Sequence, residues 1–378
     1  MKNNQNRILQ LDIIRGFALL GIFLVNMPSF HSPQFMYSFF GLSQSYTEFE
    51  KGLAIFQKLF IEMKFYPIFS FLFGLSFYLF LSKYPVFSFI KRMIVLLLIG
   101  LCHLLFLWYG DILHAYALTG IMLIPFYRLK PKQILIWSII FLFTYHLILL
   151  STIFSSIKYV YDERFINENI KAYVTLYQSD SYFHWFFSHL QIEVIPILFQ
   201  FPLSIFPILG FFLLGLYAGK KNLFSISLKN KRLIKKLIVW CSFISLLLVI
   251  TNFIFLTYDI FTSPIQHSIS QFVTSLSGVS LSILYMCTIY LWVTKEKWKK
   301  ALLPFQYVGR MSLTNYLFQS LISIGIIRIF DLYGKLNLIE GTLLCVLIFA
   351  MQTIVSYIWL LKFKKGPIEW FWRKVTKT

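Results

Sequence analysis

Apolar segments of about 20 residues recur from one end of the chain to the other. A helix needs about 20 predominantly apolar residues to cross a bilayer, because each residue adds about 1.5 Å to its length. Hydrophobic residues make up 58% of the chain and charged residues 13%, and the mean hydropathy is +0.71. We therefore predict an all-α fold, a polytopic membrane bundle of about ten transmembrane helices. The expected spans are about 8–30, 64–82, 92–109, 112–128, 133–155, 195–218, 236–257, 268–294, 311–331 and 339–361.

Positive charge is concentrated in every second loop of this arrangement. Most of the 35 Lys and Arg residues lie on one side, and most of the 15 Asp and Glu residues lie on the other. Basic loops stay in the cytoplasm, so we predict that both termini are cytoplasmic. The formal charge of +20 then reflects topology and a weak attraction to anionic lipid. We expect the lipid bilayer as a partner and no nucleic acid.

The chain shows no internal repeat, heptad run or flexible linker, so we expect 1–378 to be a single integral membrane domain. The segments 31–63 and 156–194 are expected outside the cytoplasm, and 362–378 is expected to be a basic, aromatic cytoplasmic tail. Aromatic and charged residues alternate in the second outer segment. This mixture suits a helix lying on the outer leaflet, and it also suits a surface that stacks a sugar-like acceptor.

The first span carries a polar stripe. Asp12, Arg15 and Asn26 fall within roughly 60° of one another on a helical wheel and cover about 21 Å of helix. Each ionised group facing lipid would cost roughly 2.5–3.5 kcal/mol, so the stripe should face other helices or a wet cavity. Pro28 can end the helix and let His31 turn over the cavity mouth. Alternatively, Asp12 and Arg15 simply pair near the headgroups, which explains the deep position of Asn26 less well.

Gly110–Leu118, with the sequence GDILHAYAL, places Asp111 three residues before His114. A carboxylate that orients an imidazole raises its basicity, and histidine is the usual general base near neutral pH. The alternative is a helix-capping Asp111 with His114 at the membrane interface. His103 is interpreted as a hydrogen-bonded histidine inside the bundle. The remaining histidines and the four cysteines have no metal-ligand spacing, so no metal is predicted.

Gly309–Ser320, with the sequence GRMSLTNYLFQS, enters an expected span from the cytoplasmic side. Arg310 lies where a cytosolic anion such as a phosphate could meet the amino end of a helix. Ser312 or Thr314 can cap that helix. Asn315 lies four residues before Gln319 and forms a second polar stripe with it, or serves interhelical hydrogen bonding.

Three stretches together resemble the YeiB-like family of bacterial inner-membrane proteins: LDIIRGFALLGIFLVN, GRMSLTNYLFQS and GPIEWFWR. The resemblance covers essentially the whole chain and implies a multi-pass protein of the bacterial inner membrane. It implies no activity, because the family has no settled one.

A more distant likeness lies near the amino end, in LDIIRG, in LVN ending at Asn26, and in YPIFSFLFG. These stretches look like those of heparan-α-glucosaminide N-acetyltransferase and of the broader transmembrane acyltransferase superfamily. Such enzymes use a cytosolic acyl-CoA and modify an acceptor on the far side of the membrane. Asn26 matches the asparagine of that family's first span, and His31 stands for a histidine that lies farther along there.

Acyl transfer is therefore the first functional hypothesis, with acetyl-CoA or another acyl-CoA as the donor. His31 or His114 would be the base, Asp111 would orient it, and Asn26 would donate to the oxyanion. The acceptor would be a small or glycan-like molecule.

The donor would bind through cations on the cytoplasmic side. Arg15 and Arg310 would hold the phosphates of CoA, and the polar stripes that contain Asp12 and Asn315 would form the passage for its pantetheine arm. A transporter or exporter could use the same stripe, and a non-enzymatic stress or immunity protein is the third alternative. The oligomeric state, including a homodimer, stays open.

Overall fold

The computed structural model describes residues 9–42, 44, 46–155, 162–179, 181–224, 228–258, 260–261 and 263–376. These residues form helices and connecting turns, without a strand among them. The predicted all-α membrane bundle is confirmed at this level.

Eight helical stretches of the described residues are long and apolar enough to cross a membrane. Four of these stretches lie within single helices: α1 (Leu9–His31), α5 (Val86–Phe106), α7 (Pro131–Ser155) and α11 (Leu228–Thr257). Two more are α12 (Ser263–Trp292) and α15 (Leu338–Lys362). The last two are composite: Glu48–Leu81 joins α3 (Glu48–Phe60) to α4 (Phe65–Leu81), and Tyr182–Lys220 joins α9 (Tyr182–His189) through Leu190–Val194 to α10 (Ile195–Lys220).

Two of the ten expected spans do not form helices that are both long and apolar enough to cross a membrane. The stretch expected at 112–128 forms α6 (Leu113–Met122), whose 10 residues extend about 15 Å before a 3-10 turn at Ile124–Arg128. The stretch expected at 311–331 forms α14 (Ser312–Ile329), which has 18 residues and buries five polar ones. Short or polar helices of this kind are held by protein neighbours rather than by hydrocarbon.

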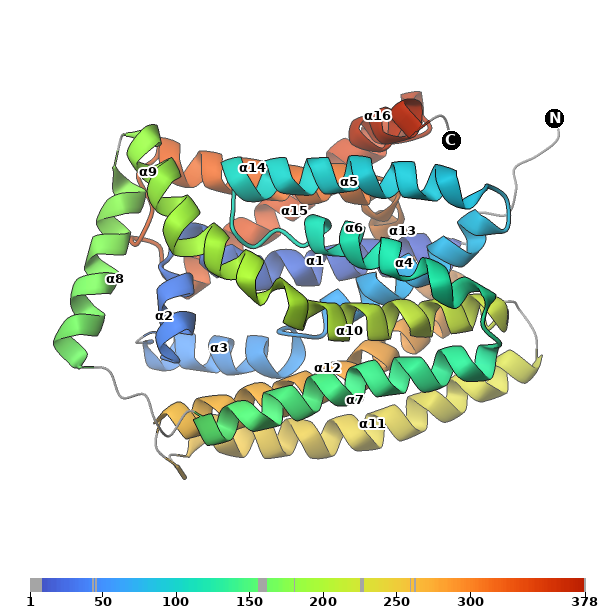
Figure 1. The fold of residues 1–378 in the computed structure, drawn as a ribbon, viewed down its shortest axis with the longest axis horizontal. Helices are drawn as coiled ribbons and strands as arrows, with labels where there is room; N and C mark the ends of the chain where they lie inside the picture. Colours follow the sequence, from blue (N-terminus) through green and yellow to red (C-terminus); the bar gives the residue numbers. More distant parts are fainter. Residues whose placement is uncertain are drawn as a thin grey trace.

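The long helices run side by side along the long axis of the molecule (Figure 1). The amino end of α1 and the terminal helix α16 (Pro367–Thr376) lie at one end of the bundle, while α2 (Gln34–Phe40) and α8 (Glu163–Gln178) lie at the other. That the first of these ends faces the cytoplasm stays a prediction from the charge pattern. The expected outer segment 156–194 falls partly outside the described residues, at 156–161 and 180.

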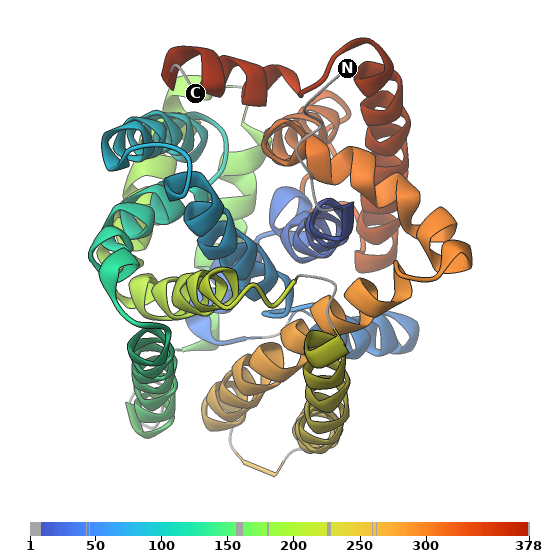
Figure 2. The same ribbon diagram turned by 90° about the vertical axis from the view of Figure 1, so that its right-hand side faces the viewer.

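Helix α1 lies in the middle of the bundle (Figure 2) and touches α13 (Glu296–Arg310) backbone to backbone. A Cβ on Gly16 would lie 1.9 Å from Phe305 O, and a Cβ on Gly309 would lie 1.9 Å from Asp12 O. Small residues allow such close helix contact inside membranes. This crossing fixes the polar end of α1 against the carboxyl end of α13, where the candidate site begins.

The helix break between α3 and α4 lies inside a span-length stretch. Met63 has a left-handed φ of 61°, and Lys64 is fully buried, with its Nζ donating to Lys58 O at 2.8 Å. A cation there stabilises the carbonyl-rich end of α3. Helix α3 thus occupies most of the second half of segment 31–63, which the sequence places outside the cytoplasm.

Candidate functional site: a cation-rimmed pocket beside a histidine–aspartate cluster

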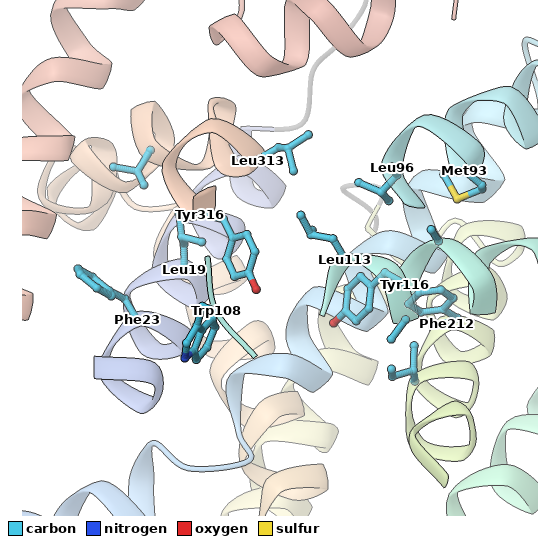
Figure 3. Close-up of a cluster of buried hydrophobic side chains, with 14 of the residues drawn as sticks. Leu19, Phe23, Met93, Leu96, Trp108, Leu113, Tyr116, Phe212, Leu313 and Tyr316 are labelled. Carbon is cyan, nitrogen blue, oxygen red and sulfur yellow. The ribbon is translucent and has the colours of Figure 1, made fainter. Parts of the chain in front are cut away.

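A pocket of about 440 Å³ opens between α1, α4, α5, α6, α14 and α16. Its walls are mainly apolar, and Figure 3 shows several of them, including Leu19, Met93, Leu96 and Leu313. Its volume is that of a typical small-molecule or cofactor site. The pocket therefore offers a built cavity at the end of the bundle where the chain's amino-terminal helix begins and its last helix lies.

The mouth of the pocket is rich in cationic side chains. The cations that line it are Arg15, Arg92, Arg310, Lys365 and Arg373. Glu369 is the acidic residue in the lining. Cations gathered at an apolar cavity attract phosphate or carboxylate groups, and arginine binds them through several parallel donors.

The tail helix α16 forms part of this mouth. The Arg92 guanidinium lies between two rings, 5.0 Å from the centre of Phe80 and 4.1 Å from the centre of Trp372. Trp372 Nε1 donates to Arg92 O at 2.9 Å. These contacts hold the predicted basic, aromatic tail against α5 and place its charges at the pocket.

The amino end of α14 binds an anion, as the sequence predicts, but this anion is the Glu369 carboxylate of the same chain. Glu369 Oε1 accepts from the backbone N–H groups of Leu313 at 2.8 Å and Thr314 at 3.2 Å. The Thr314 hydroxyl donates to Glu369 Oε2 at 2.5 Å. The tail carboxylate thus takes the capping position that the sequence assigns to Ser312 or Thr314.

The polar stripe of α1 divides in the structure. Asp12 is buried and its Oδ1 lies 2.9 Å from Arg15 Nη1, while Arg15 Nη2 reaches Ser76 Oγ at 3.5 Å. Arg15 lines the pocket; Asp12 and Asn26 lie outside its lining. Asn26 is half-buried, and its backbone oxygen accepts from Ser29 Oγ.

Two further candidates also lie outside the pocket lining. His31 is buried, and its ring lies so close to α15 that a Cβ on Gly341 would meet Nε2 at 2.2 Å. Asn315 donates to Val308 O at 3.2 Å and to Ser356 Oγ at 2.9 Å, which joins α14 to α13 and α15. The interhelical hydrogen bonding left open for Asn315 is therefore present.

Asp111 and His114 come together as their spacing predicts, and His103 joins them. His103 Nδ1 lies 3.0 Å from Asp111 Oδ1, and His114 Nδ1 lies 2.9 Å from Asp111 Oδ2, which also accepts from His114 N at 3.0 Å. All three side chains are buried. Gly100 allows this approach of α5 to α6, because a Cβ there would lie 2.4 Å from His114 N.

The ionisation state of Asp111 determines which ring nitrogens of His103 and His114 carry a hydrogen. Burial would raise the pKa of this carboxyl, but the hydrogen bonds from His103 and His114 outweigh burial and lower the pKa. An ionised carboxylate only accepts, so Nδ1 of each ring carries a hydrogen; in the neutral form of a ring the lone pair then lies on Nε2. His103 Nε2 is buried and has no hydrogen-bond partner among the described residues.

Tyr316 connects this cluster to the pocket. It lines the pocket, and its ring centre lies 5.4 Å from that of His103. Ile112 and Leu113, which lie between Asp111 and His114 in the chain, also line the pocket. The cluster is thus one layer of side chains beyond the inner end of the cavity. Among the described residues, no group of three or more His, Cys, Asp or Glu has the geometry of a metal site, and the absence of a metal stays a prediction.

The architecture defines a polytopic helical membrane protein with a cation-rimmed internal pocket. Residues 218–378, which include Arg310 and the whole of α16, match a family described as "Protein of unknown function (DUF418)". The chain is 29% identical over 392 residues to "Uncharacterized protein YxaH" of Bacillus subtilis (strain 168), covering 98% of this chain and 94% of that protein. It is 24% identical over 400 residues to "Uncharacterized protein YeiB" of Escherichia coli (strain K12), covering 98% and 96%.

A protein described as "Uncharacterized 39.9 kDa protein in amylase 3'region" of Bacillus acidopullulyticus is 29% identical over 387 residues, with 98% of this chain and 94% of that protein covered. These matches confirm the predicted resemblance to YeiB-like proteins. The relatives are bacterial. None of the three printed names states an activity.

Proposed function

We propose that this protein is a membrane acyltransferase that moves an acyl group, such as acetyl, from cytosolic acyl-CoA to an extracytoplasmic acceptor in the bacterial inner membrane. One observation carries the proposal: the cation-rimmed pocket is lined by Tyr316, whose ring lies 5.4 Å from His103 of a buried histidine–aspartate cluster. The pocket provides a place for an anionic donor, and the cluster provides a base beside its inner end.

The base in this proposal is His103 or His114. Asp111 accepts from Nδ1 of both rings, which holds them in the tautomer whose Nε2 can take a proton. The acceptor's hydroxyl or amine attacks the thioester carbon while Nε2 removes its proton. The C–S bond then breaks, and the proton passes to the thiolate of CoA. The sequence also assigns His31 and Asn26 to this chemistry. None of the candidate histidines lines the pocket, and His103 and His114 are favoured because the ring of His103 lies 5.4 Å from that of the pocket residue Tyr316.

The donor's phosphates would lie at the mouth. Arg15 and Arg310, the cations that the sequence assigns to these phosphates, line the pocket, and Arg92 and Arg373 add two further guanidinium groups. Asp12 supports this arrangement through its ion pair with Arg15. The acyl end of the donor would then extend between apolar walls towards Tyr316.

Calorimetric titration of the purified protein with acetyl-CoA tests the donor site. Saturable binding is expected, and Arg15→Ala and Arg310→Ala should each weaken it about 10-fold or more, since a hydrogen bond to a charged group contributes about 1.5–3 kcal/mol. Arg328→Ala is the matched control, because Arg328 is exposed and donates to Ser179 O at 3.2 Å, away from the pocket. Absence of saturable binding in the wild-type protein would exclude this function.

The chemistry is tested separately with Asp111→Asn. This variant should bind acetyl-CoA as the wild type does but lose most acyl transfer, because an amide cannot hold both rings in the productive tautomer. Equal transfer by the variant and the wild type would remove the cluster from the mechanism.

A second candidate function, transport, is favoured by the helix break at Met63 and the fully buried Lys64. Broken helices and intramembrane cations mark substrate and ion paths in transporters. Proton flux into proteoliposomes, followed with an enclosed pH-sensitive dye, tests this alternative. Flux that Lys64→Met abolishes and Asp111→Asn preserves would support transport; no flux in the wild type would exclude proton coupling.

A further inference from the structure

Tyr316 lines the pocket and contacts the histidine–aspartate cluster, and it is not among the candidates from the sequence. Its side chain is 6% exposed, and its ring is tilted by 47° against that of His103. Figure 3 shows the Tyr316 hydroxyl among Leu19, Leu113 and Trp108. A molecule that enters from the mouth therefore reaches Tyr316 before it reaches the histidine–aspartate cluster.

The hydroxyl of Tyr316 has an unused hydrogen-bond donor. Its oxygen accepts from Ile112 N at 3.4 Å, and within the described residues the hydroxyl hydrogen has no acceptor. A phenol both donates and accepts, and a buried donor is normally paired. The hydrogen is thus available to a ligand in the pocket.

Tyr116 lines the same pocket and shows the opposite situation. Its hydroxyl lies 2.7 Å from Ser70 Oγ and donates to Tyr66 O at 3.1 Å. Both functions of that hydroxyl are used within the protein. Tyr116 therefore provides a matched internal control for a role of Tyr316.

Trp108 is a second donor beside His103. Its Nε1 is buried without a partner among the described residues, and its ring centre lies 6.2 Å from that of His103. Tyr316 lines the pocket and Trp108 does not. Of these two donors, Tyr316 is therefore the one that a pocket-bound thioester meets.

We propose that Tyr316 donates a hydrogen bond to the carbonyl oxygen of the bound acyl thioester and stabilises the oxyanion that forms there. This inference rests on the proposed acyl transfer and makes Tyr316 a further catalytic residue in it. When the acceptor's oxygen or nitrogen bonds to the carbonyl carbon, the C=O π electrons move to oxygen and His103 Nε2 takes the acceptor's proton. When the C=O bond re-forms, the C–S bond breaks and the thiolate takes that proton.

This assignment replaces an expectation about Asn26. The sequence assigns the oxyanion donor to Asn26, which is half-buried and outside the pocket lining. Tyr316 combines a pocket position, a free donor hydrogen and contact with a candidate base. Such preorganised donors act at the atom where negative charge develops.

Infrared difference spectroscopy tests the hydrogen bond without a known acceptor. Acetyl-CoA labelled with ¹³C at the thioester carbonyl is bound to the purified protein, and its C=O stretch is compared with that of the free thioester. The wild-type protein should shift this band to lower wavenumber. Tyr316→Phe should return the band to the free value while weakening acetyl-CoA binding by no more than about 10-fold, since a neutral hydrogen bond contributes about 0.5–1.5 kcal/mol. Tyr116→Phe should keep the wild-type shift.

The outcomes separate the two proposals. Binding without a band shift in the wild type, or an equal shift in Tyr316→Phe, would overturn the role of Tyr316 and leave the donor site standing. No binding by the wild type would remove both. Once an acceptor is identified, Tyr316→Phe should lower kcat roughly 100- to 1,000-fold with little change in KM for acetyl-CoA, and a change within threefold would contradict the proposal.

Discussion

His103 Nδ1 lies 3.0 Å from Asp111 Oδ1, although the two residues are 8 positions apart at the end of one helix and the turn that follows. The turn closes because α5 and α6 touch at Gly100, where a Cβ would lie 3.0 Å from Asp111 Oδ2. A shared carboxylate thereby fixes two imidazoles at once. This relationship links the stability of the bundle to the chemistry proposed for it.

Replacement of Asp111 by Asn should lower the free energy of unfolding by about 3 kcal/mol. The amide leaves one imidazole without a charged acceptor in a buried site, and breaking a buried charged hydrogen-bond network typically costs about 3–5 kcal/mol. Unfolding by denaturant in detergent, followed by circular dichroism, measures the change. Asp331→Asn, at an exposed residue that pairs with Lys335, should leave stability unchanged. Equal stability of Asp111→Asn and wild type would show that the cluster contributes nothing to the fold.

Acid should destabilise the wild-type protein through the same carboxyl. The pKa of Asp111 is lowered in the folded state by its imidazole hydrogen bonds, in spite of burial. A depressed pKa adds stability that is complete above the unfolded value of about 3.9 and is lost as pH falls through the folded value. Thermal unfolding midpoints should therefore fall more steeply below about pH 4 in the wild type than in Asp111→Asn. Parallel curves for the two proteins would contradict this prediction.

The glycine crossing between α1 and α13 should tolerate no side chain. Gly16→Val places carbon within about 2 Å of Phe305 O and should cost about 3 kcal/mol or more, because two backbones have to separate. Gly325→Ala in α14 is the control: nothing lies within 4 Å of its Cβ, so stability should stay equal or rise by less than about 1 kcal/mol. Denaturation of both variants measures the difference, and a stable Gly16→Val protein would disprove the close crossing.

Removal of the carboxylate that caps α14 should have two opposite effects. Glu369→Gln weakens the acceptor for Leu313 N and Thr314 N, and it should lower the free energy of unfolding by about 1 kcal/mol. It also removes negative charge from a cationic mouth, so acetyl-CoA should bind several-fold more tightly at low salt. Glu340→Gln at the opposite end of the bundle should not affect binding. Weaker binding by Glu369→Gln would show that the tail carboxylate supports the donor site.

The sequence was sufficient for those features that depend on local spacing and composition. The apolar segments predict the helical bundle, the three-residue step predicts the Asp111–His114 contact, and the charge of Arg15 predicts its place at a cavity. Features that depend on tertiary contact were out of reach. From the sequence, His103 is interpreted as an ordinary bundle histidine, because no local pattern connects it to Asp111. Tyr316 has no sequence signal of its own, since its importance follows from its position beside His103 in the folded protein.

Helical periodicity alone also misplaces polar residues relative to a cavity. Asn26 and Arg15 share one face of α1, yet only Arg15 lines the pocket, because the neighbours of that helix change along its length. Asn315 faces α13 and α15, where the backbone of Val308 and the hydroxyl of Ser356 satisfy it. A helical wheel predicts the direction in which a side chain points. The neighbouring helices decide whether that side chain meets a cavity or another part of the chain.

The glycine crossing at Gly16 and Gly309 also has a consequence for biosynthesis. Helix α1 leaves the ribosome well before the segment that it touches backbone to backbone, which is made nearly 300 residues later. Contacts of such large sequence separation form late. Helix α1 is therefore fully enclosed only after the carboxyl-terminal third of the chain has been made, and its Asp12–Arg15 ion pair lowers the cost of exposing these charges to lipid until then.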